Sequence, residues 1–251
     1  MNNLYGNDDS FESWDNEVYV DENPYSHYGR TTSYEDTEAK IVTRSFLVMF
    51  VALLVTAITA TVVATDISNM IVIAENIHIL LIAEIATVFA SSFFINKRNV
   101  VISAILFGLY SIINGATMSF IFFAYELGSV QSIFLVTALL FGVMAVIGMF
   151  TKINLSSMGG ICSMALIGII LVSIANIFFI HAEGLEILIN YLVVFIFIGL
   201  TAYDAQKLKE VSRSADEADV NIVSIFWGMQ LYLDFINLFL RLLALFGRKR
   251  N

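Results

Sequence analysis

The sequence predicts an all-α polytopic membrane protein, folded as a seven-transmembrane-helix bundle with a central C-terminal helix. Hydrophobic residues make up 58% of the 251 residues and charged residues only 14%. Apolar runs of about twenty residues recur along the chain, and each is long enough as a helix to cross about 30 Å of hydrocarbon. A soluble domain of this size would instead show helices with one apolar and one polar face.

Residues 1–40 differ from the rest of the chain in composition. They hold ten acidic and two basic residues, so they carry a net charge of −8 out of the −9 of the whole chain. The segment is rich in Asp, Glu, Asn, Ser and Tyr and has no sustained hydrophobic period, which is typical of disorder. It also lacks the basic and apolar regions of a secretory signal. We expect a disordered acidic cytoplasmic tail at 1–40 and a membrane domain at 41–251.

Seven apolar stretches are candidate transmembrane helices, because polar or charged residues separate each from the next. They lie at residues 44–65, 76–95, 100–124, 132–151, 158–180, 188–209 and 223–246.

The basic residues predict the orientation of the bundle, because basic loops stay in the cytoplasm. The connecting segments 66–75, 125–131 and 181–187 contain no Lys or Arg, whereas eight basic residues fall on the other side: Lys40, Arg44, Lys97, Arg98, Lys152, Lys207, Lys209 and Arg213. The N-terminus is therefore predicted to be cytoplasmic. Seven crossings place the basic residues 248–250 outside, which conflicts with this rule, so six crossings and a re-entrant last segment are the alternative.

The last apolar stretch carries a polar stripe formed by Gln230, Asp234, Asn237 and Arg241. Spacings of four, three and four residues keep these side chains within about 60° of one another on a helix. Apolar residues surround the stripe, which favours a central helix whose stripe faces neighbouring helices or a water-filled cavity. A set of interhelical hydrogen bonds with no further role is the alternative.

Two aspartates at membrane depth are the strongest functional candidates. Asp204 lies near the cytoplasmic end of the sixth stretch, and Asp234 lies midway along the seventh. A carboxyl group at that depth costs roughly 2.5–3.5 kcal/mol, so it needs a partner, a proton or water. Two carboxyl groups in contact cannot both ionise cheaply, so they would share a proton and titrate as a coupled pair. Such a pair would act as a pH switch.

The stretches Ala-Tyr-Asp204-Ala-Gln-Lys and Leu-Tyr-Leu-Asp234-Phe-Ile-Asn-Leu-Phe, together with Gly115 in Asn-Gly-Ala-Thr, carry a family resemblance. Over residues 40–247 the chain resembles the Bax inhibitor family, the transmembrane Bax inhibitor motif proteins, in a bacterial-type form. The resemblance implies a pH-sensitive calcium leak, closed by an Asp204–Asp234 pair that binds calcium transiently. It also implies a basic latch near the inner end of the second helix, for which Lys97 and Arg98 are the candidates.

Glu84 lies within the second apolar stretch, and an acid at such a position is a functional candidate by default. Calcium prefers carboxylate and carbonyl oxygens, so Glu84 is a candidate for the ion path, as are Gln230, Asn237 and Arg241. A protonated or hydrogen-bonded structural Glu84 is the alternative.

An enzyme is an alternative to a channel. Two intramembrane aspartates also occur in aspartyl proteases, but those enzymes resemble one another through Gly-x-Gly-Asp, where this chain has Leu231-Tyr-Leu-Asp234. No phosphate-binding loop, metal-spaced histidine set or Ser/His constellation is visible, so we expect neither an enzyme nor a cofactor. The sparse basic surface gives no reason to expect nucleic acid.

A regulator that binds other membrane proteins, such as a membrane protease or cell-death machinery, is the second hypothesis. The expected partners are thus the lipid bilayer and calcium ions and, under the regulator hypothesis, other membrane proteins. Short loops and the lack of a retention signal favour a bacterial plasma membrane.

Overall fold

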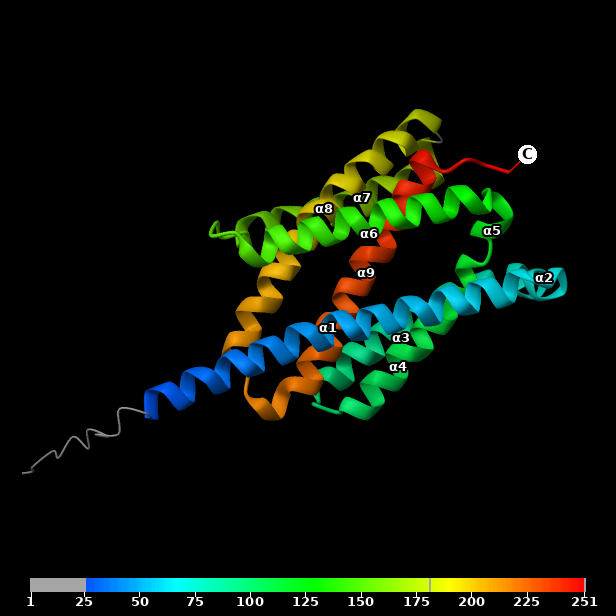
Figure 1. Ribbon diagram of the computed structural model, residues 1–251. Coiled ribbons are helices and arrows are strands. Elements are labelled where there is room, and N and C mark those ends of the chain that lie inside the picture. The colour runs from blue at the N-terminus through cyan, green and yellow to red at the C-terminus, as the bar shows by residue number, and fades with distance from the viewer. Residues whose placement is uncertain (1–25, 181, 251) are drawn as a thin grey trace, which may run out of the picture.

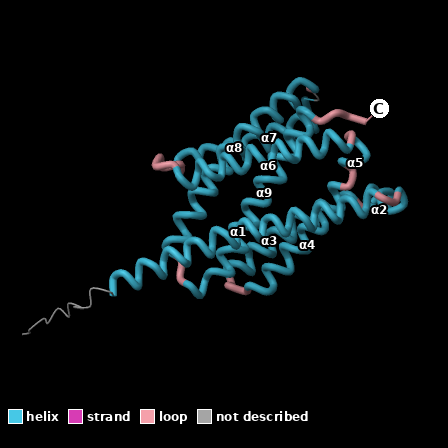
Figure 2. Tube along the Cα trace, in the orientation of Figure 1, coloured by secondary structure: helices cyan, strands magenta, loops and turns pink. Residues whose placement is uncertain are grey.

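The computed structural model describes residues 26–180 and 182–250, and this part of the chain is almost entirely helical (Figures 1 and 2). No strand occurs in it, and its one isolated bridge joins Tyr125 and Lys249. The helices are α1 (Ser26–Ala64), α2 (Ile67–Glu75), α3 (Ile77–Asn96), α4 (Val100–Met118), α5 (Ile121–Ala124), α6 (Leu127–Phe150), α7 (Ser156–Ala175), α8 (Glu183–Ser214) and α9 (Val220–Phe246), with a π-helical turn at Asn176–Ile180 and a 3₁₀ turn at Glu217–Asp219.

Seven helical segments in the described part are long and apolar enough to cross a membrane, which confirms the predicted fold class. They are Glu35–Ala64, Ile77–Asn96, Val100–Ala124, Leu127–Phe150, Ser156–Ala175, Gly184–Ser214 and Glu217–Phe246.

The first helix starts earlier than the apolar pattern predicted. α1 begins at Ser26, so part of the segment assigned to a disordered tail is helical, and the expected boundary at residue 40 is not the start of the helix. Residues 1–25 lie outside the described residues, so their disorder stays a prediction.

Two later helices begin with side-chain caps of the expected kind. Asp66 accepts from Ser68 N at 2.8 Å, and Asn99 accepts from Ile102 N at 3.0 Å.

The helices form two groups that α9 joins. α1, α3 and α4 pack together, α6, α7 and α8 pack together, and α9 packs chiefly against α1 and α8, as Figure 1 shows. In the most apolar stretch of the α9 span, 56% is buried inside the protein. The corresponding stretches of α3 and α7 are each only 6% buried. The C-terminal helix is therefore central, and the outer helices present their side chains to the surroundings of the bundle.

α9 runs without interruption from one end of the bundle to the other. It begins beside the α3–α4 turn, where Arg98 pairs with Asp219 at 3.0 Å, and it ends beside the α5–α6 connection, where Arg248 pairs with Glu126 at 3.5 Å. A 27-residue helix spans about 40 Å, enough for a full crossing. The re-entrant alternative for the last segment is thus not what the structure contains.

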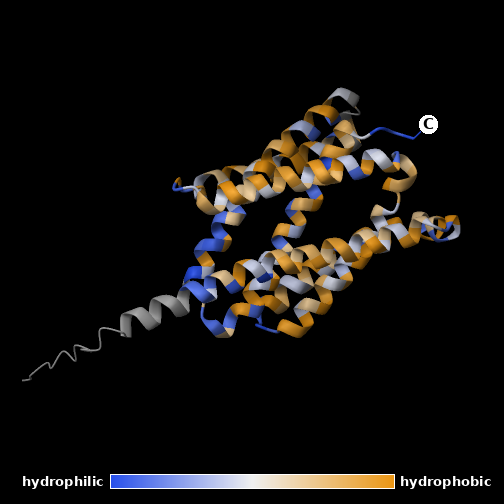
Figure 3. Ribbon diagram, in the orientation of Figure 1, coloured by the Kyte–Doolittle hydropathy of each residue, from blue (hydrophilic) through white to orange (hydrophobic). Residues whose placement is uncertain are grey.

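The eight basic residues that predicted the orientation gather at the end of the bundle where α9 begins. Contacts between distant segments hold this end together, among them Arg213–Glu38 at 2.9 Å and Lys40–Glu217 at 3.4 Å. Figure 3 shows hydrophilic residues concentrated in these segments and in the C-terminal segment at the opposite end, with hydrophobic residues between them. The basic residues at 248–250 thus lie at the end that the other loops leave without Lys or Arg.

Candidate functional site

Asp204 of α8 and Asp234 of α9 meet inside the bundle. Their carboxyl groups face each other closely enough to share a hydrogen bond, and the two residues are only 5% and 2% exposed. Gln230, one turn before Asp234, donates from Nε2 to Asp204 Oδ2 at 3.1 Å. A hydrogen bond between two carboxyl groups requires a proton on one of them, because two carboxylates offer only acceptors.

The contact forms because α8 and α9 are antiparallel neighbours joined by a short connection. α8 continues to Ser214, beyond the predicted end of its apolar stretch, and α9 begins at Val220. Asp204 therefore lies about 15 Å from the end of α8, and Asp234 about 21 Å from the start of α9. The reach of two side chains closes the remaining difference in depth.

No cation neutralises the pair within the described structure. No hydrogen-bond donor among the described residues reaches the buried Oδ2 of Asp234. Arg241, the one cation of the polar stripe, instead donates from Nη1 to Asn190 Oδ1 at 2.9 Å. Since an unpaired buried charge is costly, a shared proton would stabilise this arrangement.

The polar stripe of α9 faces α8, but its members do not all join one network. Gln230 and Asp234 contact Asp204, and Arg241 contacts Asn190 further along α8. Asn237 donates from Nδ2 to Leu233 O of its own helix at 2.8 Å. The stripe is therefore an interface between two helices, with the aspartyl pair at one end and the Arg241–Asn190 bond at the other.

Two glycines let neighbouring helices approach the site closely. A Cβ atom on Gly148 of α6 would collide with the backbone carbonyl of Ala202, two residues before Asp204 on α8. A Cβ on Gly159 of α7 would meet the ring of Tyr203 at 2.5 Å. α6 and α7 thus press against the segment of α8 that carries the aspartate.

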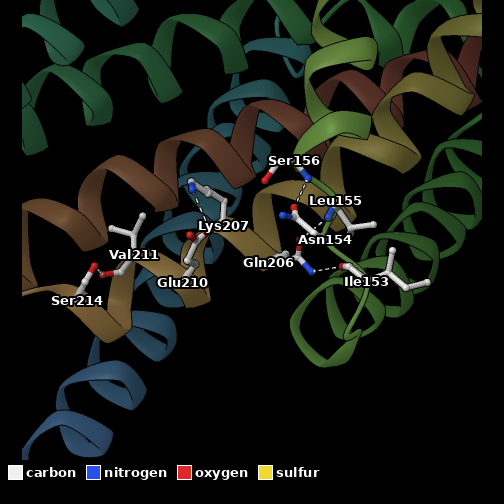
Figure 4. A network of polar contacts seen from close by, with 9 residues as sticks. All are labelled: Ile153, Asn154, Leu155, Ser156, Gln206, Lys207, Glu210, Val211 and Ser214. Carbon is white, nitrogen blue, oxygen red and sulfur yellow. Dashed lines mark hydrogen bonds and ion pairs between the residues drawn. The ribbon is translucent and has the colours of Figure 1, made fainter.

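Next to Asp204, the polar end of α8 is tied to the α6–α7 connection (Figure 4). The Gln206 amide accepts from Leu155 N and donates to Ile153 O, both at 2.8 Å. A cavity of about 580 Å³ lies here, lined in part by Gln206 and by the basic residues Lys152, Lys209 and Arg213. Neither aspartate lines this cavity, which lies beside the pair at the basic end of the bundle.

A second polar cluster lies on the opposite face of α9. Tyr232 donates to Asn114 Oδ1 at 3.0 Å, and its hydroxyl lies 2.7 Å from Thr56 Oγ1, which in turn donates to Ser111 O at 3.0 Å. Glu84 lies beside this cluster, next to Asn114 and Thr117 of α4, although its Oε1 has no partner among the described residues. Glu84 therefore lies in the α1–α3–α4 group, across α9 from the aspartyl pair.

Sequence reasoning missed the role of Tyr232 and Thr56 in this cluster. A signal was present, because Tyr232 lies two residues before Asp234 and so points to a different face of the helix. Neutral polar residues scattered over three apolar stretches, however, give no pattern that joins them.

The two latch candidates lie away from the pair. The Lys97 ammonium is 4.4 Å from the centre of the Phe93 ring, and Arg98 is ion-paired with Asp219 at the start of α9. Arg98 adopts a left-handed backbone conformation with φ 57, uncommon for a residue other than glycine. A latch role for either residue in another arrangement of the helices stays a prediction.

The pair could offer calcium few ligands. Calcium takes six to eight oxygens, whereas no group of three or more His, Cys, Asp or Glu side chains suited to a metal occurs within the described ranges. Asp204, Asp234 and the Gln230 amide could supply part of such a shell, and water would complete it. This donor set fits brief contact with a passing ion better than a resident one.

Comparison with known proteins identifies the family. Residues 38–251 match the family model described as inhibitor of apoptosis-promoting Bax1. The chain is 42% identical over 208 residues to the inner membrane protein YbhL of Escherichia coli K12, covering 80% of this chain and 88% of that protein. It is also 36% identical over 217 residues to a Borreliella burgdorferi protein, covering 84% and 93% of the two chains. The chain is therefore an integral membrane protein of the Bax inhibitor family.

Proposed function

We propose that this protein is a pH-sensitive calcium leak channel whose gate is the Asp204–Asp234 pair. The observation that carries the proposal is the buried contact between the Asp204 and Asp234 carboxyl groups, which joins α8 to the central helix α9 and has no cation among the described residues paired with it. The strength of this contact would depend directly on a shared proton, because two carboxylates offer only acceptors.

The gating step follows from the charge of the pair. With one shared proton the carboxyl groups attract each other and hold α8 against α9. When the proton leaves, two negative charges about 4 Å apart repel by about 4 kcal/mol at an effective dielectric constant of about 20. Separation relieves this repulsion by letting water and cations reach both carboxylates, so calcium would compete for the place of the proton.

The direction of the pH effect can be stated from linkage. The closed state binds the shared proton and the open state releases it, so rising pH favours the open state. Calcium flux should therefore increase as pH rises and be suppressed in acid.

The ion path proposed here starts at the polar cavity beside Gln206 and passes the aspartyl pair. Glu84, across α9, is a candidate for a second carboxylate along the path. Arg241 would repel a cation, so its bond to Asn190 has to hold it aside or its charge has to be balanced by the ionised aspartates. Gln230 and Asn237 offer neutral oxygens between these charges.

We also propose which end of the bundle faces the cytoplasm and which membrane holds the protein. Eight basic residues lie at the end of the bundle where α9 begins, and the positive-inside rule assigns that end to the cytoplasm. The first helix therefore enters from the cytoplasm. The description of the Escherichia coli relative as an inner membrane protein supports a bacterial plasma membrane.

A catalytic use of the two carboxyl groups fits the site less well. An aspartyl protease must bring a substrate backbone against its aspartates. Here Leu231 and Tyr232, which precede Asp234, are 0% exposed and packed into the core. The approach that a glycine would allow is filled by these side chains.

The test is calcium entry into proteoliposomes that contain only this protein, measured with an internal calcium dye from pH 5 to pH 8. We expect flux that rises with pH in the wild type and loses this dependence in Asp234→Asn. Asp66→Asn is the matched control, because it changes an exposed aspartate at a helix N-cap where asparagine also caps. An absence of flux at every pH, with the protein inserted and folded, would reject the channel and favour a regulator that needs a partner protein.

A further inference from the structure

A second cavity lies toward the end of the bundle where α9 finishes. It has a volume of about 1160 Å³ and is lined mostly by apolar side chains from α1, α4, α5, α6 and α9, among them Leu53, Met118, Phe122, Phe134 and Phe239. This volume exceeds the range of roughly 300–1,000 Å³ that is typical of pockets for small organic ligands. The aspartyl pair does not line it, and Thr56 is the member of the Tyr232 cluster that does.

The cavity opens sideways, between α1 and α6. These two helices are not among the pairs that pack closely, and Figure 1 shows them apart with α9 behind them. On the α6 side, Leu127 and Leu135 line the cavity and are 57% and 63% exposed, and on the α1 side the exposed Ala57 lines it. At this depth the surroundings are hydrocarbon, so an apolar cavity open to them suits an acyl chain better than water.

A short basic segment closes the end of this cavity. Residues 247–250 follow α9 and run antiparallel to the α5–α6 connection, with Glu126 N donating to Arg248 O and Arg250 N donating to Ala124 O, both at 3.0 Å. Ser129 Oγ accepts from Arg248 N at 2.8 Å. These backbone bonds fix the segment in place, although its side chains are exposed.

Arg250 lines the cavity, and its guanidinium has no partner among the described residues. The neighbouring Arg248 makes an ion pair with Glu126 in which its side chain remains 79% exposed. Arg250 is thus available where the apolar cavity meets the polar surface. Arg248 lies two residues away and is largely exposed, although it is paired with Glu126, which also lines the cavity. The charge of the two arginines is complementary to a phosphate, and a guanidinium binds phosphate with two parallel hydrogen bonds.

We propose that this cavity is a binding site for an anionic glycerophospholipid. One acyl chain lies between α1 and α6 against Ile236 and Phe239 of α9, and the phosphate contacts Arg250 and Arg248. The site accounts for the basic residues 248–250 at an end of the bundle where the other loops have none. It is independent of the proposed channel, because none of its residues belongs to the aspartyl pair.

The first experiment uses the full wild-type chain in nanodiscs that contain phosphatidylglycerol or phosphatidylcholine with a diazirine in one acyl chain. After irradiation, peptide mass spectrometry locates the labelled residues. We expect phosphatidylglycerol to label the lining residues of α1 and α6 around Ala57 and Phe134 more than phosphatidylcholine does. Equal labelling by the two lipids would overturn the proposal, because it would mean that bulk lipid alone fills the cavity.

The second experiment measures binding of the two lipids to purified variants by native mass spectrometry. Arg250→Gln should weaken phosphatidylglycerol binding about tenfold, since a hydrogen bond to a charged group is lost, while Lys152→Gln at the other end should not. Ala57→Phe should fill the cavity and reduce binding of the first lipid molecule, while Ala86→Phe on the exposed face of α3 should not. Affinity that is unchanged in both Arg250→Gln and Ala57→Phe would reject the site.

Discussion

The two faces of α9 differ in the kind of contact that they make. Toward α8, the helix presents Asp234, whose carboxyl group contacts that of Asp204. Toward α1 and α4, it presents Tyr232, whose bonds to Thr56 and Asn114 join neutral groups and lie among aromatic rings. Under the proposed gating, the contact with α8 would therefore change with pH, and the contacts with α1 and α4 would not.

This difference indicates which parts of the bundle would move. Edge-to-face contacts with Phe107 and Tyr110, at centroid distances of 5.5 and 5.7 Å, fix Tyr232 in the α1–α3–α4 group. α9 would therefore stay with this group while α8, with α6 and α7 packed on it, separates from it. The proposed gate is then a hinge between two helix groups.

The largest expected effect comes from breaking the neutral face. Tyr232→Ala removes a fully buried ring and should destabilise the protein by about 3–5 kcal/mol, as for other large aromatic residues in cores. Tyr232→Phe keeps the ring, loses the hydroxyl bonds, and should cost about 1–3 kcal/mol. Thermal unfolding of detergent-solubilised variants measures both. A Tyr232→Ala protein as stable as the wild type would mean that this face does not hold the bundle.

The second prediction tests the titrating face. In Asp234→Asn the amide can donate to the Asp204 carboxylate without a shared proton, so the α8–α9 contact should persist at every pH. Calcium flux should then stay low and nearly constant, whereas the wild type should change with a coupling of about 1.4 kcal/mol per pH unit across its transition. Asp204→Asn should behave in the same way. Steep pH curves in both variants, at equal expression, would leave the aspartates as structural groups.

Gly115 and Gly108, both on α4, test how closely α4 packs against α1. A Cβ on Gly115 of α4 would lie 2.6 Å from the carbonyl oxygen of Thr56, so Gly115→Ala should push α4 away from α1 and cost about 1–3 kcal/mol. Gly108 of the same helix has no atom within 4 Å of the corresponding position. Gly108→Ala should therefore stabilise the protein by up to about 1 kcal/mol, through helix propensity alone. Chemical denaturation of the two variants compares them, and equal effects would contradict the close α1–α4 contact.

Much of the fold could be predicted because hydrocarbon imposes a simple rule on sequence. Runs of apolar residues located all seven spans, and the four-three-four spacing of polar residues identified α9 as the helix with a polar interface. The cost of a carboxyl group at membrane depth also identified Asp204 and Asp234 as the strongest functional candidates. These features follow from local composition and helical period.

Other features depend on information that the sequence spreads over distant segments. The cluster around Tyr232 joins neutral residues of three helices, and Arg98 finds Asp219 only because the α3–α4 turn lies beside the start of α9. The fifth span was predicted to continue to residue 180, but its α-helix ends at Ala175 and a π-helical turn follows, a change that an unbroken apolar run does not reveal. Residues 26–40 are likewise too polar for the apolar pattern to predict that α1 begins at Ser26.

The smallest effect is expected from removing the part of the tail that precedes α1. Deletion of residues 2–25 should leave insertion, stability and pH-dependent flux unchanged, because this segment carries none of the polar residues of the membrane domain. A deletion that reaches Thr43 is a different test, since it also removes the Glu38–Arg213 and Lys40–Glu217 pairs and the fully buried Ile41. That longer deletion should destabilise the end of the bundle where α1, α8 and α9 meet. Comparison of flux and thermal stability for the two deletions therefore separates the tail from the start of the helix. Altered flux in the shorter deletion, with normal stability, would show that the acidic segment takes part in gating.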